Sequence, residues 1–410
     1  MLTNYNRYIS YERTYGRAAA SGNSLTFSLM NICMFLFLSL IVVFLFPSGY
    51  PQINDGFMVI GFVFLLAYAF AQKYWAINKA FFAALLFGAL TFTINSIYLI
   101  FYQDVRLLLS SMYYVYNAVI FIFTATVVRK SPDKANLAIY GGIIISLLSM
   151  TFICVAYPEY RNNRIIGPFN NPNQLASWSL VSMAILLILK KHKRLNLIDF
   201  GLLVLFAYLQ TLALSKAGII CTILMLVSIP FTKMVSPSMR TLSLFLAFLL
   251  FIFSLQAMVT LYEKIQKVEF LDRSVSRLEN IGQEGDDSLE GRKYDRFVKF
   301  PEYLITGAGE GAFHRFTEGY KPSEMHSGVG NILFSYGIFG FVAFVYFLYS
   351  VSKKNDKYFL YILMVLMLYG LTHQNIRDSQ FWLFLGLAYS NRFIVEYDRN
   401  KKAAPSGEYE

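Results

Sequence analysis

Charge is scarce in this sequence of 410 residues. Asp, Glu, Lys and Arg make up 15% of it, against 56% hydrophobic and 17% aromatic residues. So little charge, with so much apolar side chain, excludes an intrinsically disordered chain and an ordinary soluble domain. The apolar residues form repeated runs, many of them long enough to cross a hydrocarbon core of about 30 Å. The sequence therefore predicts an all-α polytopic membrane protein.

Cysteines and cofactor-binding motifs are also scarce. The three cysteines, Cys33, Cys154 and Cys221, all lie inside apolar runs, so they form neither a disulfide framework nor a metal-ligand spacing. The sequence contains no HExxH, CxxC, P-loop or Asp-x-Asp motif. We therefore expect neither a metal nor another cofactor.

Twelve apolar segments can be drawn as membrane spans. They cover residues 25–47, 56–71, 80–101, 107–128, 136–157, 174–189, 198–214, 217–231, 241–262, 327–350, 358–371 and 380–395. These spans predict five regions along the chain. They are an N-terminal segment (1–24), helices one to nine (25–262), a large polar loop (263–325), helices ten to twelve (326–395) and a tail (396–410).

Basic residues lie mainly on one side of these spans. With the N-terminus in the cytoplasm, 21 of the 36 Lys and Arg fall on inner segments, whereas 17 of the 25 Asp and Glu fall on outer ones. The positive-inside rule therefore predicts that both termini are cytoplasmic and that the large loop lies outside. Because topology accounts for most of the net charge of +11, we expect no nucleic-acid partner, which would need one basic domain face.

The large loop is dense in charge and glycine. Hydrophobic residues from Val268 to Leu278 recur at helical spacing, which predicts an amphipathic helix on the membrane surface. A second helix is expected from Arg292 to Leu304, with a tight glycine turn after it at residues 306–311. A large loop on a rigid scaffold usually carries function.

The middle of each predicted span is free of ionisable residues. Ion-coupled transporters and channels usually bury such residues at mid-membrane, so transport is the less favoured hypothesis. Single polar residues such as Asn95, Asn117 and Gln210 are typical of hydrogen bonds between helices. Any chemistry is therefore expected at the outer ends of the helices.

Two candidate groups precede outer helix ends in the middle of the chain. Arg161 and Arg164 stand before a Gly-Pro-Phe-Asn-Asn-Pro-Asn segment that ends at Asn173. A stiff loop capped by Asn173 explains the Gly, Pro and Asn residues, but not two arginines on the face that otherwise lacks them. Ser215 and Lys216 form the short connector after span seven, where the lysine either anchors a helix end among head groups or holds a phosphate.

Two further groups lie in and after the large loop. Arg292 belongs to a charged run that could simply be a solvated helix. His326 and Ser327 begin span ten, followed by Gly337 and Gly340. Two glycines three residues apart allow a neighbouring helix to approach closely, which would hold His326 at the outer surface.

Together these groups supply at least three cations and one imidazole on the outer face. Arginine forks bind phosphate oxygens in a bidentate manner, and histidine suits the role of a general base near neutral pH. The ligand most compatible with both is a lipid diphosphate whose tail stays in the bilayer. Asp378, before the last span, either caps that span or orients His326 or an acceptor hydroxyl.

Several of these motifs resemble those of the O-antigen ligase and O-antigen polymerase superfamily. His326-Ser327, nine residues and then Gly337-Ile-Phe-Gly340 match its H-[N/S/Q]-x9-G-x-x-G pattern. The other similar segments follow in the family's order: Arg164–Ala176, Leu214–Gly218, Gly291-Arg292 and the glycine turn at 306–311. The resemblance covers roughly residues 135–390, and the first four spans match only in hydropathy.

The resemblance implies a GT-C-type membrane glycosyltransferase whose donor is an undecaprenyl-diphosphate-linked glycan. Arg292 and one of Arg161 or Arg164 would hold the diphosphate, and His326 would deprotonate the acceptor sugar hydroxyl. Lys216 stands where the family has arginine, so a point charge replaces a bidentate fork. Supporting roles would fall to four residues at the same outer ends, Asn173, Ser215, Ser327 and Asp378. The reaction would be an inverting, metal-independent displacement at the anomeric carbon.

Polymerase and ligase differ in their acceptor. A polymerase extends another lipid-linked repeat unit, whereas a ligase transfers the glycan to lipid A-core. Because the Gly-Pro-Phe-Asn-Asn-Pro-Asn segment is more typical of polymerases, a surface-polysaccharide polymerase is the first hypothesis, a ligase the second and a flippase the third. The implied partners are the lipid-linked oligosaccharide, an acceptor glycolipid, membrane lipids and a chain-length regulator protein. The implied location is a bacterial inner membrane, with the active site on the periplasmic side.

Overall fold

The computed structural model describes residues 24–46, 50–71, 78–161, 164–235, 291–316 and 324–403, with side chains up to Asn391. Its long helices are α2 (Ser24–Ser39), α3 (Ile53–Ala71), α4 (Lys79–Tyr102), α5 (Val105–Lys130), α6 (Pro132–Ala156), α7 (Pro172–Lys190), α8 (Leu197–Ala213), α9 (Lys216–Ser228), α14 (Gly328–Ser352), α15 (Lys357–Gly370) and α16 (Ser379–Ala403). The short elements are β1 (Tyr160–Arg161), β2 (Arg164–Ile165), η1 (Ile229–Phe231), α12 (Arg296–Lys299), α13 (Tyr303–Thr306), η3 (Phe313–Arg315) and η4 (Asn375–Arg377).

The helices coincide with eleven of the twelve predicted ranges. The predicted span at 241–262 and the predicted amphipathic helix at 268–278 lie outside the described residues. Six helices (α3, α4, α5, α6, α7 and α14) are long and apolar enough to cross a membrane, and four shorter apolar helices accompany them. Large hydrophobic side chains such as Ile100, Phe152 and Phe339 are exposed along this bundle, as expected of a membrane-embedded protein.

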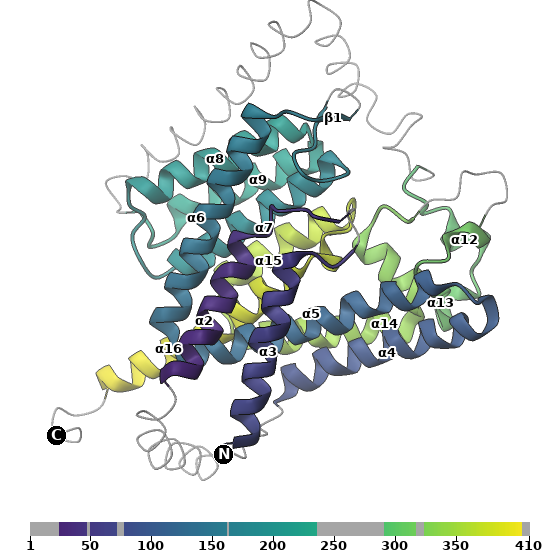
Figure 1. Ribbon diagram of the computed structural model, residues 1–410, viewed down its shortest axis with the longest axis horizontal. Helices are drawn as coiled ribbons and strands as arrows, with labels where there is room; N and C mark the ends of the chain where they lie inside the picture. The colour runs from purple at the N-terminus through teal and green to yellow at the C-terminus, as the bar shows by residue number, and fades with distance from the viewer. Residues whose placement is uncertain are drawn as a thin grey trace, which may run out of the picture.

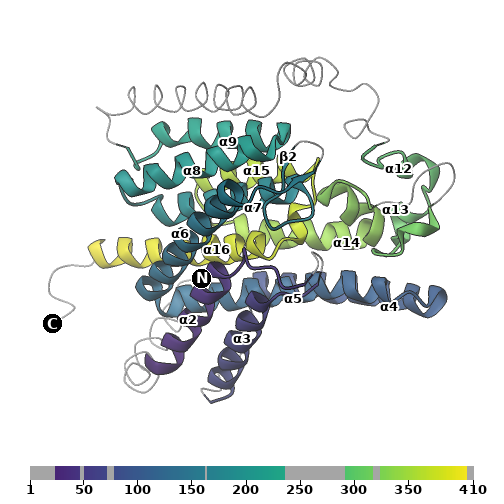
Figure 2. The same ribbon diagram turned by 45° about the horizontal axis from the view of Figure 1, so that its top comes forward.

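The bundle has two chemically different ends. In Figures 1 and 2, α4, α5 and α14 run side by side along the long axis, while α2, α3 and α6 are inclined to them. The short helices α12 and α13 lie at one end, which we call the loop end. The start of α7, the start of α14 and the end of α15 also lie there, since hydrogen bonds join Tyr369 to Asn173 and Gly328 to His373.

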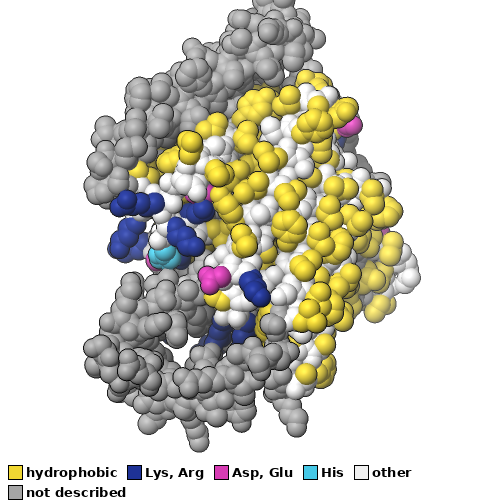
Figure 3. All heavy atoms as spheres, turned by 60° about the vertical axis from the view of Figure 1, so that its left-hand side comes forward, with side chains coloured by type: hydrophobic (Ala, Val, Ile, Leu, Met, Phe, Trp, Pro, Cys, Tyr) yellow, Lys and Arg dark blue, Asp and Glu magenta, His cyan; other side chains and the backbone are white. Residues whose placement is uncertain are grey.

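The opposite end, which we call the basic end, carries the turns α7–α8 and α14–α15. Lys191 reaches across to Asp356 at 3.1 Å, which ties the two turns together. Lys190 forms an ion pair with the buried Asp199 at 2.9 Å, and Tyr140 donates a hydrogen bond to the same carboxylate. Figure 3 shows Lys and Arg side chains gathered at this end beside a flank covered largely by hydrophobic side chains.

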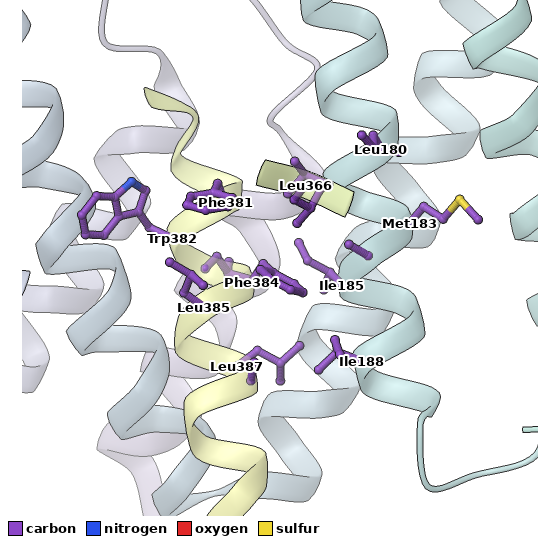
Figure 4. Close-up of a cluster of buried hydrophobic side chains, with 14 of the residues drawn as sticks. Leu180, Met183, Ile185, Ile188, Leu366, Phe381, Trp382, Phe384, Leu385 and Leu387 are labelled. Carbon is purple, nitrogen blue, oxygen red and sulfur yellow. The ribbon is translucent and has the colours of Figure 1, made fainter. Parts of the chain in front are cut away.

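Helix α7 is the centre of the bundle. In α7, 83% of the most apolar stretch is buried inside the molecule, compared with 28% of the corresponding stretch in α3 and in α4. Figure 4 shows Ile185 and Ile188 of α7 pointing toward Phe384 and Leu387 of α16. Because lipid tails are as apolar as these side chains, the contact stabilises the bundle through close packing. The loop that enters α7 is thereby attached to the most deeply buried of the six candidate spans.

The described part of the large loop differs from the single helix expected for Arg292–Leu304. A turn occupies residues 291–295, and two short helices, α12 and α13, follow it. Pro301 separates them, since proline lacks the N–H that a continuous helix needs and disfavours helical backbone at Phe300. Their aromatic residues Phe300 and Tyr303 pack with Phe316 and Phe334 in a small second core.

The glycine pair of α14 acts differently from the prediction. Gly337 breaks the helix with φ +63°, and a Cβ there would lie 2.3 Å from the carbonyl oxygen of Ile305. The break frees the carbonyls of Phe334 and Ser335, which accept hydrogen bonds from the N–H groups of Ala308 and Gly309 at 2.9 and 2.8 Å. The close neighbour at Gly337 is therefore the end of α13 and the glycine turn after it, and not a long helix of the bundle.

Candidate functional site

The arginine loop before α7 is a short hairpin fastened to the end of α8. Strands β1 and β2 pair antiparallel, with Arg161 opposite Arg164. The Arg164 guanidinium donates to the carbonyl of Ala213 at 2.9 Å and to the side chain of Asn173 at 2.7 Å. These two hydrogen bonds hold the side chain of Arg164 between the start of α7 and the end of α8.

Asn173 is not the helix cap that the sequence predicts. Asn171 caps α7, since its side chain accepts the N–H of Asn173 at 2.8 Å, and Pro172 occupies the first helical position. An N–H group at the first helical position has no partner within the helix, so proline, which lacks that group, is favoured there. The side chain of Asn173 accepts from Arg164 instead.

Tyr369, near the end of α15, joins this loop to the rest of the loop end. Its hydroxyl donates to the carbonyl of Asn173 at 2.9 Å and lies beside Ser215, the residue that caps α9. The ring of His373 stacks on Tyr369 with centroids 4.6 Å apart and planes 9° from parallel. Tyr369 is fully buried, so the hydroxyl is held in place.

The segment before α14 is fastened to the same end of α15. The backbone N–H of His326 donates to the carbonyl of Arg292 at 3.2 Å, and the Arg292 guanidinium donates to the carbonyl of Thr372. Ser327 caps α14 by accepting the N–H of Gly330 at 2.9 Å, and its hydroxyl donates to Gly370 at 3.2 Å. His326 is exposed on this fixed backbone.

Residues 369–373 therefore connect the two halves of the predicted site. Arg164 reaches them through Asn173 and Tyr369, and Arg292 through the Thr372 carbonyl. The chain between α15 and α16 contributes the carbonyl of His373, which accepts the N–H of Gly328 at 2.9 Å. Segments more than 150 residues apart in sequence thus meet on one turn.

Asp378 connects two helices near this junction. Its carboxylate accepts a hydrogen bond from Ser177 of α7, and its backbone carbonyl accepts the N–H of Phe381 at 3.0 Å in the first turn of α16. Burial raises the pKa of Asp378 to about 6, although Ser177 and Arg377 lower it. These contacts make Asp378 a link between α7 and α16.

The other two predicted ligands are Arg161, on the hairpin, and Lys216, on α9. Arg161 is exposed, and its guanidinium donates to the carbonyl of Asn170 at 2.7 Å within its own loop. Lys216 is half-buried in the first turn of α9, next to Ser215. Between the two arginines of the hairpin, the contacts single out Arg164 as the one joined to α15.

A second charged cluster surrounds Glu310 in the glycine turn. Glu310 is buried, its carboxylate accepts the hydroxyl of Tyr336 at 2.8 Å, and it lies 3.2 Å from Arg377. Its backbone N–H donates to Asn95 at 2.9 Å, and Arg377 also binds Glu324 at 3.0 Å. Burial raises the pKa of Glu310, and Arg377 opposes that shift. For Arg377, burial would lower the pKa, but Glu324 and Glu310 overcome it and raise the pKa.

Tyr369, Glu310 and Arg377 belong to this region of the structure although no sequence motif singled them out. Tyrosine is common in this chain, with 29 residues, so composition could not distinguish Tyr369. Glu310 offered a signal, since it is an acidic residue between two glycines of the predicted turn. Gly309 and Gly311 both adopt positive φ, which directs this short stretch into the protein.

Among the described residues, no group of three His, Cys, Asp or Glu side chains could hold a metal ion. A scan against protein-family models finds no match, and a search of curated proteins finds none either. The resemblance to the O-antigen ligase and polymerase superfamily therefore stands on the motif residues alone.

Proposed function

We propose that the protein is a membrane glycosyltransferase that polymerises a surface polysaccharide. Its donor is an undecaprenyl-diphosphate-linked glycan, and its acceptor is a sugar hydroxyl of another lipid-linked repeat unit. The observation that carries the proposal is the meeting of Arg164 and Arg292 with His326 around residues 369–373. Cations and an imidazole gathered at the end of apolar helices suit a diphosphate whose lipid tail lies in the bilayer.

In the proposed topology the loop end lies on the periplasmic side of the inner membrane. In this scheme the chain crosses the membrane twelve times in a GT-C-like arrangement, and both termini are cytoplasmic. The separation of a basic end from the loop end supports this orientation, because inner connectors carry the excess of Lys and Arg. The donor would then reach Arg164 from the outer leaflet of a bacterial inner membrane.

The chemistry is a single displacement with inversion. The acceptor oxygen attacks the anomeric carbon, and the bond from that carbon to the diphosphate oxygen breaks. The electron pair leaves with the lipid diphosphate, where Arg164 and Arg292 offset the developing negative charge. The acceptor proton passes to the imidazole of His326, whose exposed position allows a substrate to reach it.

Rates of transfer with purified protein test this proposal. The assay combines the full chain in detergent or vesicles with lipid-linked repeat units and measures longer glycans in the absence of nucleotide and ion gradient. We expect Arg164→Ala, Arg292→Ala and His326→Ala each to lower the rate at least about a hundredfold, consistent with the loss of a group that acts in the transition state.

Two variants serve as controls for charge and loop position. Lys299→Ala removes an exposed cation that pairs with Asp295 in the same loop, and it should leave the rate unchanged. Arg161→Ala should lower the rate less than Arg164→Ala, since the exposed Arg161 donates to the carbonyl of Asn170 in its own loop. Wild-type rates in both Arg292→Ala and His326→Ala would contradict the proposal.

The acceptor decides between polymerase and ligase. In a smooth bacterium that lacks this gene, a polymerase predicts a lipid A-core that carries a single repeat unit. Bare core together with long lipid-linked chains would instead identify a ligase. If purified protein forms no product but moves lipid-linked glycan across vesicles, a flippase is the better explanation.

A further inference from the structure

Tyr294, in the turn that contains Arg292, joins this turn to the ends of two long helices. Its hydroxyl donates to the carbonyl of Leu371, the residue after α15, at 2.6 Å. The same hydroxyl lies 2.7 Å from the hydroxyl of Ser327, which caps α14. The ring lies against the first turn of α14, where a Cβ at Gly330 would come within 3.1 Å of it. Tyr294 therefore fastens the loop to α14 and α15 together.

The backbone of this turn adopts a conformation that needs such contacts. Lys293, the residue before Tyr294, has φ +64°, in the left-handed region that residues with a Cβ rarely occupy. A residue stays in this conformation only where the surrounding structure imposes it, and such residues cluster at functional sites. The hydroxyl of Tyr294, one residue further on, supplies contacts that hold the turn in place.

The same turn positions both groups that the proposed reaction uses on this side of the site. The carbonyl of Arg292 accepts the N–H of His326 at 3.2 Å, so the turn helps to place the backbone that carries the imidazole. The Arg292 guanidinium donates to the carbonyl of Thr372, next in the chain after the carbonyl that Tyr294 binds. A shift of this turn would therefore move the cation and the imidazole relative to each other.

We propose that Tyr294 is a positioning residue for the transfer reaction, because its hydroxyl keeps the Arg292 turn against α14 and α15 with Arg292 and His326 in a fixed relation. Fixed geometry contributes strongly to enzymatic rates, since a misplacement of about 1 Å can slow a reaction about a hundredfold. This role rests on the proposed transferase function. Tyr294 acts through Arg292 and His326, and it does not contact the reacting atoms.

Tyr294→Phe tests the two hydroxyl contacts alone, because it keeps the ring. In the transfer assay with the purified full chain, we expect kcat to fall at least about tenfold, while KM for the lipid-linked donor changes less than about threefold. The reason for this split is that the Arg292 guanidinium keeps its contact with Thr372, whereas the backbone that carries His326 is held less firmly.

Tyr98→Phe is the matched control, since Tyr98 of α4 binds the same loop. Its hydroxyl donates to the carbonyl of Gly307 at 2.7 Å, in the glycine turn rather than in the Arg292 turn. Both variants lose a tyrosine hydroxyl that binds a backbone carbonyl, so their melting temperatures should fall by similar amounts. Only Tyr294→Phe should lower kcat. Equal kcat values in the two variants would overturn the positioning role.

Hydrogen exchange tests the link to His326 without requiring transfer. The backbone N–H of His326 should exchange at least about tenfold faster in Tyr294→Phe than in wild type, and at the wild-type rate in Tyr98→Phe. Mass spectrometry of overlapping peptides that contain His326 measures this rate in the detergent-solubilised full chain. Unchanged exchange, or faster exchange with a wild-type kcat, would contradict the proposal for Tyr294. If wild type forms no product while exchange responds as expected, the transferase proposal fails and the link from Tyr294 to His326 stands.

Discussion

Tyr369 is the residue on which the two halves of the site depend most. Its hydroxyl binds the carbonyl of Asn173, while its ring stacks on His373. Tyr369→Phe keeps the ring and removes the hydroxyl, so we expect a loss of about 1 kcal/mol in the free energy of unfolding. Because Arg164 is then less firmly placed, the transfer rate should fall at least about tenfold.

Tyr361 provides a matched control on the same helix. Its hydroxyl donates to the carbonyl of Leu224 at 2.7 Å, away from the site. Tyr361→Phe should therefore lose similar stability and keep its transfer rate. Equal rates in the two variants would mean that Tyr369 has a structural role only.

Asp378 should make stability depend on pH in an unusual direction. Burial raises the pKa of its carboxyl group from about 3.8 to about 6, so the folded protein holds this proton more tightly than the unfolded chain. The contribution of Asp378 to stability is therefore fully present below about pH 4 and is lost as the pH rises to about 6. Asp378→Asn should raise stability at pH 7, by up to about 3 kcal/mol, and flatten this dependence.

Asp356 at the basic end should respond in the opposite way. Burial would raise the pKa of Asp356, but the N–H of Phe359 and the ammonium of Lys191 prevail and lower it. Its contribution is therefore present at neutral pH and is lost as the pH falls through the lowered value. Melting temperatures of Asp378→Asn and Asp356→Asn between pH 2 and 8 check both signs, since the Asp356 contribution is lost only below about pH 3.8. Parallel curves would contradict the assignment.

At this scale, sequence predicts charged motif residues better than the groups that connect them. Arg164, Arg292 and His326 each stand in a recognisable motif near the end of a predicted helix, so the sequence singles them out. Tyr369 and Glu310 acquire their importance from partners that are more than 190 residues away in sequence. Such contacts exist only after the helices have packed.

The break in α14 is the element that shapes the loop end. At Gly337 a side chain would collide with the carbonyl of Ile305, and positive φ adds strain for any residue with a Cβ. We therefore expect Gly337→Ala to lower the free energy of unfolding by at least about 2 kcal/mol. It should also lower the transfer rate, since Ala308 and Gly309 would lose the carbonyl partners that hold the loop against α14.

Gly201 of α8 is the matched control for this substitution. A Cβ there would meet nothing within 4 Å, and the residue lies inside a helix. Gly201→Ala should therefore raise stability by about 0.5–1 kcal/mol. Thermal unfolding of both variants in the same detergent measures the contrast; a tolerated Gly337→Ala would show that the break is not required.

Helix positions were predictable because apolar length alone specifies them, whereas the structure of α14 was not. Its sequence reads as one continuous span, and the glycine pair has the spacing of a helix–helix contact. Only the neighbouring Ile305–Gly309 segment turns Gly337 into a break. The prediction of a single helix for Arg292–Leu304 was wrong. The sequence already contains the reason, because Pro301 lies within that range.

On the scale of the whole molecule, the separation of charge and apolar surface predicts a defined orientation in the membrane. Thr306→Cys is exposed at the loop end, whereas Lys193→Cys and Lys354→Cys are exposed at the basic end. The native cysteines Cys33, Cys154 and Cys221 are buried, so they should contribute little labelling.

Labelling of intact cells with a membrane-impermeant maleimide measures this orientation. We expect Thr306→Cys to react from outside, and the two basic-end cysteines to react only after the inner membrane is permeabilised. The physical reason is that Lys and Arg in short connectors are retained in the cytoplasm during insertion. If Thr306→Cys is protected in intact cells while Lys354→Cys reacts, the bundle has the opposite orientation in the membrane. The arginines and His326 would then face the cytoplasm, away from a donor in the outer leaflet, and the proposed transfer could not take place there.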